Sequence, residues 1–334
     1  MHKASVWIPA GEKVECQLCH HYCKIREGRK GLCQVRQNVD GVLYSLNYGK
    51  LIAANIDPIE KKPLYHFLPG SRSYSIGATG CNFRCAWCQN WDISQLSDRN
   101  NPDRLPFTTP EQVVNAAVQS GCKSISYTYT EPTIFYEFAR DVSILAREAR
   151  LKNVWVSNGY MAELMLDEYL PLMDAINVDI KAFDDGVYRK YAGAHLKPIL
   201  DNCVQLKKAG VWLEVTTLLI PGVNDNEGQV NGIANFIAND LGKDTPWHVS
   251  RYYPQAQFTE ISATEPQTII EAVKTGKDAG LQFVYTGNLG RKEDTNCPSC
   301  GELLISRSAL WMTGNRVKEG ACPNCSNKIA GIWE

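Results

Sequence analysis

The chain of 334 residues lacks any apolar run close to the roughly 20 residues that a membrane-spanning helix needs. Its first residues, 1–9, also lack the hydrophobic stretch of a secretory signal peptide. The formal net charge is −1, which provides no strong overall attraction for nucleic acid or for an anionic membrane. These absences predict a cytoplasmic protein without a membrane partner.

Cysteine, in contrast, is abundant, with 13 residues in the chain. In a short secreted protein this content would indicate disulfides, but here most cysteines are clustered in a long chain, which favours metal binding. Cys122 and Cys203 stand alone and are interpreted as small buried apolar residues. The others form three groups: Cys16, Cys19, Cys23 and Cys33; Cys81, Cys85 and Cys88; Cys297, Cys300, Cys322 and Cys325.

From about residue 72, short runs of β-forming residues alternate with helical patterns. The predicted strands are 73–78, 124–129, 154–157, 175–180, 212–219, 248–252 and 282–285. The predicted helices are 109–119, 134–149, 162–170, 199–209, 227–241 and 266–279. This alternation is typical of a parallel sheet with right-handed crossovers, and it is too short for a closed eight-unit barrel. We therefore expect an α/β fold, a partial (β/α)6-type open TIM barrel.

Two smaller modules are expected to flank this barrel. Residues 1–70 are interpreted as a Cys-rich N-terminal module followed by a hairpin, because residues 42–46 and 51–54 are short β-like runs. Residues 71–291 form the predicted barrel, and residues 292–334 a C-terminal zinc-ribbon-like module.

The central cysteine group has the spacing C-x3-C-x2-C and directly follows the first predicted barrel strand. Clusters of the [4Fe-4S] type are normally held by four thiolates. Cys81, Cys85 and Cys88 provide only three, so one iron would be open to a small molecule. The alternatives are a zinc site or a cluster completed by a distant cysteine.

With Trp87 before Cys88, this loop resembles the C-x3-C-x-aromatic-C signature of the radical SAM superfamily. The resemblance implies a [4Fe-4S] cluster whose open iron binds the amino and carboxylate groups of S-adenosylmethionine (SAM). It implies reductive cleavage of SAM to a 5′-deoxyadenosyl radical, which abstracts hydrogen from a substrate. It also implies a low-potential electron donor of the flavodoxin or ferredoxin type.

Further cofactor contacts are expected where the barrel strands end. Many members carry Gly-Gly-Glu-Pro after the second strand, whereas this chain has Tyr129 and Thr130 before Glu131 and Pro132. Glu131 is a candidate acceptor for the SAM ammonium, or alternatively a charge that the positive end of a helix favours. The full set of predicted SAM-binding residues is Trp87, Thr130, Glu131, Ser157, Asn158, Asp179, Lys181, His248 and Arg251.

Asp179 and Lys181 alternate on one strand, so their side chains share a face; the alternatives there are cofactor binding and a plain salt bridge. His248 and Arg251 lie near the last predicted strands, in either a functional or a structural role. No single residue is assigned as catalytic.

Over most of its length the chain is similar to the pyruvate formate-lyase-activating-like branch, and within it to the radical SAM enzymes of the AmmeMemoRadiSam system. This resemblance implies association with AMMECR- and Memo-family proteins, while glycyl-radical installation would be an analogy only. The segments that carry it are 16–23, 31–36, 62–67, 81–90, 129–133, 157–160 and 247–254.

The flanking cysteine groups differ in spacing. The C-terminal group consists of two C-x2-C pairs about 20 residues apart, which is typical of structural zinc, with rubredoxin-like iron as the alternative. The N-terminal spacing C-x2-C-x3-C-x9-C leaves zinc, an auxiliary Fe–S cluster or no metal open, and His20 or His21 could replace a thiolate. This region is also locally basic, which suits an acidic partner, RNA or a solvated face.

We therefore predict a radical SAM enzyme that acts on a macromolecule, either protein or RNA. The small metal modules are the reason for favouring a large substrate. The alternatives are a non-catalytic zinc or iron–sulfur scaffold for partner proteins, and a radical enzyme with a small-molecule substrate.

Overall fold

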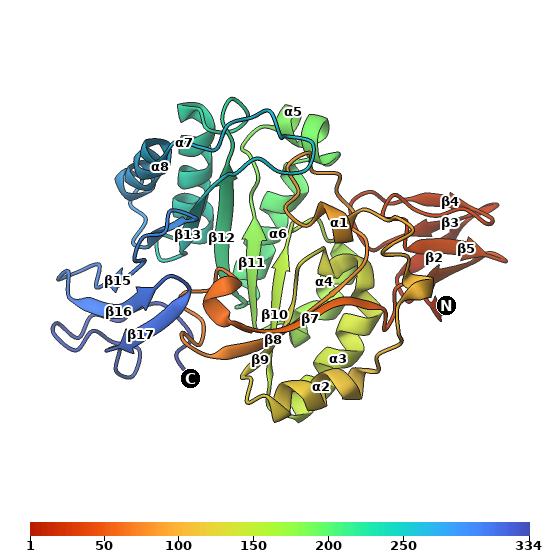
Figure 1. Cartoon of the computed structure of the whole chain (residues 1–334), viewed down its shortest axis with the longest axis horizontal. Coiled ribbons are helices and arrows are strands. Elements are labelled where there is room, and N and C mark those ends of the chain that lie inside the picture. The colour runs from red at the N-terminus through yellow and green to blue at the C-terminus, as the bar shows by residue number, and fades with distance from the viewer.

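The computed structural model describes residues 1–334, and its centre is an eight-stranded sheet in the order β14-β13-β12-β11-β10-β9-β8-β7 (Figure 1). The edge strands β14 and β7 do not pair with each other, so the predicted partial, open barrel is confirmed. The parallel strands are β8 (Arg72–Ala78), β9 (Ser124–Tyr127), β10 (Lys152–Ser157), β11 (Ala175–Asp179), β12 (Trp212–Leu219), β13 (Trp247–Arg251) and β14 (Val284–Gly287).

Helices connect these strands and cover the sheet. The helix predicted over 109–119 begins at Pro110, and Thr109 is its N-cap: Thr109 Oγ1 accepts from the Gln112 N–H at 3.3 Å, and Gln112 Oε1 accepts from the Thr109 N–H at 2.9 Å. None of the helices combines the length and apolar character that crossing a bilayer requires. They are α1 (Trp91–Ser94), α2 (Pro110–Gln119), α3 (Tyr136–Glu148), α4 (Glu163–Tyr169), α5 (Asp185–Val187), α6 (Lys197–Lys208), α7 (Glu227–Phe236) and α8 (Pro266–Asp278).

The predicted hairpin near residues 42–54 is wrong. Strand β6 (Val42–Ser45) pairs with its neighbours in an N-terminal sheet, whereas β7 (Leu51–Pro58) pairs antiparallel with β8. Pairing with β7 satisfies backbone groups of β8 that would otherwise lie unpaired at the edge of the parallel sheet. The N-terminal module therefore gives way to the barrel sheet near residue 50, before the predicted boundary.

Three short sheets flank the barrel, and Figure 1 shows the N-terminal ones and the C-terminal one at opposite ends of the molecule. The N-terminal sheets consist of β2 (Trp7–Ala10), β3 (Lys13–Cys16) and β4 (Lys24–Arg26), and of β1 (His2–Lys3), β6 and β5 (Arg36–Val39). The C-terminal sheet consists of β15 (Thr295–Asn296), β16 (Leu303–Ser308) and β17 (Trp311–Asn315).

Candidate active site and metal centres

The cysteine loop follows β8 at the carboxyl edge of the parallel strands, where α/β barrels gather their reacting groups. Gly80 starts the loop at φ +107°, and a Cβ at this position would lie 3.1 Å from the Cys33 carbonyl oxygen. Glycine is therefore needed both for the backbone conformation and for the close approach of the N-terminal module.

The three loop cysteines are half-buried and carry free sulfur atoms. The Phe83 N–H donates to Cys81 Sγ at 3.3 Å, and Cys88 Sγ lies 3.3 Å from Ser94 Oγ. Burial raises the pKa of Cys85 to about 11 and that of Cys81 well above its ordinary value. Cys81 and Cys85 are thus neutral thiols on their own, and a bound metal is what would ionise them.

A cavity of about 750 Å³ opens between this loop and the ends of the barrel strands. Cys81, Cys85 and Cys88 are the only cysteines on its wall, an arrangement that fits a cluster with one iron lacking a protein ligand. The wall also contains eight of the predicted SAM-binding residues: Trp87, Thr130, Glu131, Ser157, Asn158, Asp179, Lys181 and His248.

Glu131 is buried and ties two strand ends together. Its Oε1 accepts from the Thr133 N–H at 3.0 Å, from the Thr133 hydroxyl at 2.6 Å and from Ser157 Oγ at 2.8 Å, while Oε2 accepts from the Asn158 N–H at 2.8 Å. Burial raises the pKa of Glu131 despite these donors. Most of its acceptor capacity is therefore used to position neighbouring side chains, which leaves Oε2 with room for one more donor.

Asn158 extends this network to the cysteine loop, because its Nδ2 donates to Asn82 Oδ1 at 2.7 Å. On the next strand, Lys181 Nζ lies 3.0 Å from Asp179 Oδ2. Burial would lower the pKa of Lys181, but Asp179 and Cys85 raise it above its ordinary value. A fixed ammonium group therefore stands beside the loop, where it complements the negative charge of a thiolate-bound cluster.

His248 contacts a buried carboxylate beneath the cavity. Its Nε2 lies 2.6 Å from Glu214 Oε2, and Glu214 also accepts from the N–H groups of Tyr65 and His66 at 3.0 and 2.8 Å. Burial would raise the pKa of Glu214, but His248 lowers it below its ordinary value. His248 is thus held in one orientation by this carboxylate.

Trp87 and Arg251 make contacts of a different kind from those of the polar candidates. Trp87 packs against Tyr191 and Phe258, with ring centroids 6.0 and 5.8 Å away, and forms an apolar wall. Arg251 is absent from the cavity wall, and its Nη1 donates to the Tyr253 hydroxyl at 3.1 Å. The structure therefore does not bring Arg251 together with the other predicted residues.

Sequence reasoning missed a buried ion pair at the cavity. Lys62 lines the wall, its Nζ lies 2.7 Å from Asp57 Oδ2, and the Tyr129 hydroxyl donates to the same oxygen at 2.6 Å. Burial lowers the pKa of Lys62 to about 8. The segment containing Lys62 contributed to the family resemblance, but nothing in its pattern indicated that it would reach the second strand.

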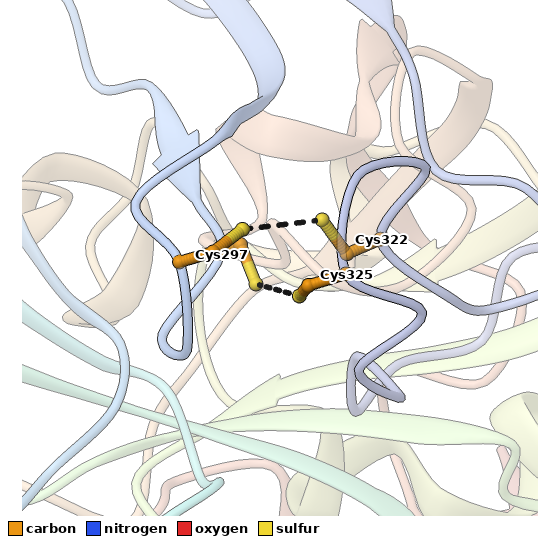
Figure 2. A group of neighbouring side chains, drawn as sticks. Cys297, Cys322 and Cys325 are labelled. Carbon is orange, nitrogen blue, oxygen red and sulfur yellow. Dashed lines mark hydrogen bonds between the residues drawn. The ribbon is translucent and has the colours of Figure 1, made fainter.

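The C-terminal cysteines form a compact group, with sulfur atoms that point toward one another (Figure 2). Cys297 Sγ lies 3.6 Å from Cys325 Sγ, Cys300 Sγ lies 3.7 Å from Cys322 Sγ, and all four atoms are within 4.8 Å of one another. Thiolates about 2.3 Å from one zinc ion in a tetrahedron are about 3.8 Å apart. This group can therefore bind a single metal ion.

The N-terminal cysteines all line one small cavity, together with Arg36 and Asn82. In this group, unlike the C-terminal one, no three sulfur atoms come within 4.8 Å of one another. His21 is tied to the central loop, because its Nε2 lies 2.8 Å from the Asn82 carbonyl oxygen. The N-terminal module thus contacts the loop directly.

An open α/β barrel with three cysteines at a strand end defines a class of metalloenzymes that bind a cluster at the barrel mouth. The profile of the radical SAM superfamily matches residues 75–230, which include this loop. The chain belongs to the radical SAM superfamily and is a radical SAM enzyme, which requires a [4Fe-4S] cluster, SAM and a reductant.

Similar proteins extend this assignment. An uncharacterized protein of Methanocaldococcus jannaschii is 46% identical over 95% of both chains. The (2S)-3-sulfopropanediol dehydratase activating enzyme of Klebsiella oxytoca is 30% identical over 34% of this chain and 35% of its own, which supports the predicted activating-enzyme-like branch. A radical SAM methyltransferase from Sphaerobacter thermophilus shares the fold, with 15% identity, 71% of each chain covered and a TM-score of 0.51.

Proposed function

We propose that Cys81, Cys85 and Cys88 hold the [4Fe-4S] cluster and that SAM binds in the adjoining cavity. The observation that carries this proposal is that three cysteines, and no fourth, line a cavity of about 750 Å³. When bound, the reduced cluster supplies the electron that cleaves the C5′–S bond of SAM and so produces the hydrogen-abstracting radical.

The residues around the cavity have different roles in binding SAM. Lys181 and Asp179 present opposite charges to the zwitterionic methionine part of SAM, and Ser157 and Asn158 are positioned by Glu131 to offer hydroxyl and amide groups. Trp87 closes the wall with apolar surface, which keeps water away from a reactive radical.

We propose a macromolecular substrate, with a protein segment favoured over RNA. The cavity wall continues from the barrel to Ala309 and Leu310 of the C-terminal module, so a substrate would contact two modules. Next to this wall, Trp311 is 62% exposed, and Trp91 after the cysteine loop is 51% exposed. Large exposed aromatic residues at a cavity are typical of protein recognition. The name of the Klebsiella oxytoca relative, an activating enzyme for a dehydratase, points the same way.

Other components follow from this proposal. A flavodoxin- or ferredoxin-type protein would supply the electron, and AMMECR- and Memo-family proteins remain the predicted partners. We also propose zinc for Cys297, Cys300, Cys322 and Cys325, on the basis of their tetrahedral spacing.

The test is an anaerobic assay of reconstituted protein with SAM and dithionite, in which 5′-deoxyadenosine is measured. We expect this product from the native chain and from Cys122→Ala, a matched control far from any cysteine group in the sequence, but none from Cys85→Ala. A colourless protein with zinc in the loop and no product would support the scaffold alternative instead. Transfer of deuterium from a labelled candidate protein, RNA or small molecule into the product would then identify the substrate class.

A further inference from the structure

The N-terminal cysteine group has the wrong dimensions for a single metal ion. One zinc ion, about 2.3 Å from each sulfur, fills the space between four thiolates and leaves no room for another atom. Cys16, Cys19, Cys23 and Cys33 instead line one cavity, in which the centre of a water-sized sphere can occupy about 10 Å³. No three of their sulfur atoms come within 4.8 Å of one another, although the C-terminal group of the same chain meets that limit with all four.

The cavity wall also carries two buried N–H donors without acceptors. Arg36 is 1% exposed, and its two terminal nitrogens donate to Glu137 at 2.7 and 2.5 Å, but its Nε has no partner. Asn82 accepts a hydrogen bond at Oδ1, whereas its buried Nδ2 has no partner. Buried donors are rarely left unsatisfied, so both point to an acceptor-rich, negatively charged group between the cysteines.

We propose that Cys16, Cys19, Cys23 and Cys33 hold a second iron–sulfur cluster, of the four-iron type, next to the radical-generating loop. Four thiolates are the ligand set of such clusters, and the sulfide and thiolate sulfurs are the acceptors that Arg36 Nε and Asn82 Nδ2 lack. A [2Fe-2S] cluster fits less well, because it would pair the sulfurs closely on each iron, and no sulfur–sulfur contact of the C-terminal kind joins these four.

The position of this cluster gives it a redox role that rests on the proposed function. Asn82 follows Cys81 in the chain and lines the N-terminal cavity, and Gly80 packs against the Cys33 carbonyl. The two cysteine groups are therefore neighbours. The second cluster would accept one electron from a reduced ferredoxin or flavoprotein and pass it to the central cluster, and SAM cleavage would consume it.

The outer surface of the module suits such a donor. Leu32, next to Cys33, is 54% exposed, so one side of the cavity lies close to solvent. The surrounding exposed charges are mostly basic and complement an acidic redox protein. They are Lys24, Arg26, Arg29 and Lys30, against Glu27.

A variant without the central ligands isolates the second cluster. In the triple variant Cys81→Ala, Cys85→Ala, Cys88→Ala, anaerobic reconstitution should leave about four irons and four acid-labile sulfides per chain, with an EPR signal after dithionite reduction. Adding Cys33→Ser should remove this iron and sulfide, whereas adding Cys122→Ala should not. Retention of zinc without sulfide, or of no metal, at the N-terminal group would overturn the proposal.

The same experiment separates this proposal from the function proposed for the loop. If the loop binds no cluster, the native chain and the triple variant will contain equal iron, whatever the N-terminal group holds. If the loop alone binds iron, the triple variant will contain none. A circular dichroism spectrum and melting curve for each variant establish that a loss of iron is not a loss of fold.

Discussion

The two four-cysteine modules of this chain use the same ligand number in different geometries. At the C-terminus the sulfur atoms are within 4.8 Å of one another, whereas at the N-terminus they surround a cavity and share its wall with the charged Arg36. The two groups also differ in their exposure to solvent and in their distance from the cysteine loop. Cys300 and Cys325 are exposed at the far end of the molecule, and the N-terminal group lies against the cysteine loop. Ligand spacing and neighbouring charge therefore distinguish two groups that have the same number of cysteines.

The largest expected effect concerns the C-terminal module. Cys322→Ala should prevent binding of the zinc proposed for this group, and so remove a binding free energy of about 10–16 kcal/mol that zinc contributes to small modules. The expected result is loss of zinc by mass spectrometry and rapid proteolytic cleavage after about residue 292, whereas the barrel resists. Cys122→Ala is the control. A tail that stays protease-resistant without metal would contradict the structural role of this group.

Substitution of Arg36 should lower the stability of the N-terminal module by breaking a buried ion pair. Arg36→Met leaves Glu137 buried without its partner, and breaking such a pair costs about 3–5 kcal/mol. Chemical denaturation at neutral pH measures this loss. Arg140→Met removes a half-exposed ion pair with Asp141 and should cost about 1 kcal/mol or less. Equal effects of the two substitutions would contradict the account of a buried pair.

The same pair predicts a pH dependence. Burial would raise the pKa of Glu137, but Arg36 holds it below the ordinary value. The stabilisation is therefore complete above the unfolded pKa of about 4.3 and is lost as the pH falls through the lower folded value. Unfolding curves between neutral and acidic pH should show a steeper loss of stability in the native chain than in Arg36→Met, and parallel curves would exclude this assignment.

A smaller effect, on SAM affinity, is expected at the barrel cavity, which lies outside both four-cysteine groups. Lys181→Met should weaken SAM binding about tenfold, or about 1.4 kcal/mol, because it removes the ammonium beside the loop. Isothermal titration with reconstituted protein measures the dissociation constant. Lys197→Met, which changes an exposed lysine paired with Asp201, should leave it unchanged. Unchanged binding in both variants would remove Lys181 from the SAM site.

Much of the barrel could be predicted from the sequence, because its strands and helices have strong patterns. Strand β12 has its predicted bounds, and α2 begins at Pro110, one residue into the predicted range. Helix α3 begins later than predicted, at Tyr136, because Pro132–Phe135 form a separate 3-10 turn. The partner of β7 could not be predicted, because alternation shows that a segment is a strand but not which strand it joins.

The site was predictable where residues follow a strand end, and less so where the contact crosses modules. Asp179 and Lys181 share the cavity because the strand pattern places them there. Lys62 and Leu310 reach it from segments whose position depends on how the modules pack, which no local pattern encodes. The cavity between the N-terminal cysteines was equally hidden, since spacing along the chain does not give distances between sulfur atoms.

The central claim is that the three-cysteine loop leaves one iron open for SAM. The most direct measurement is the EPR spectrum of the dithionite-reduced protein before and after SAM is added, compared with that of the triple cysteine variant of the loop. We predict that SAM changes one signal and that this signal is missing from the variant. A spectrum that SAM does not change, or an unchanged signal in the variant, would contradict the account.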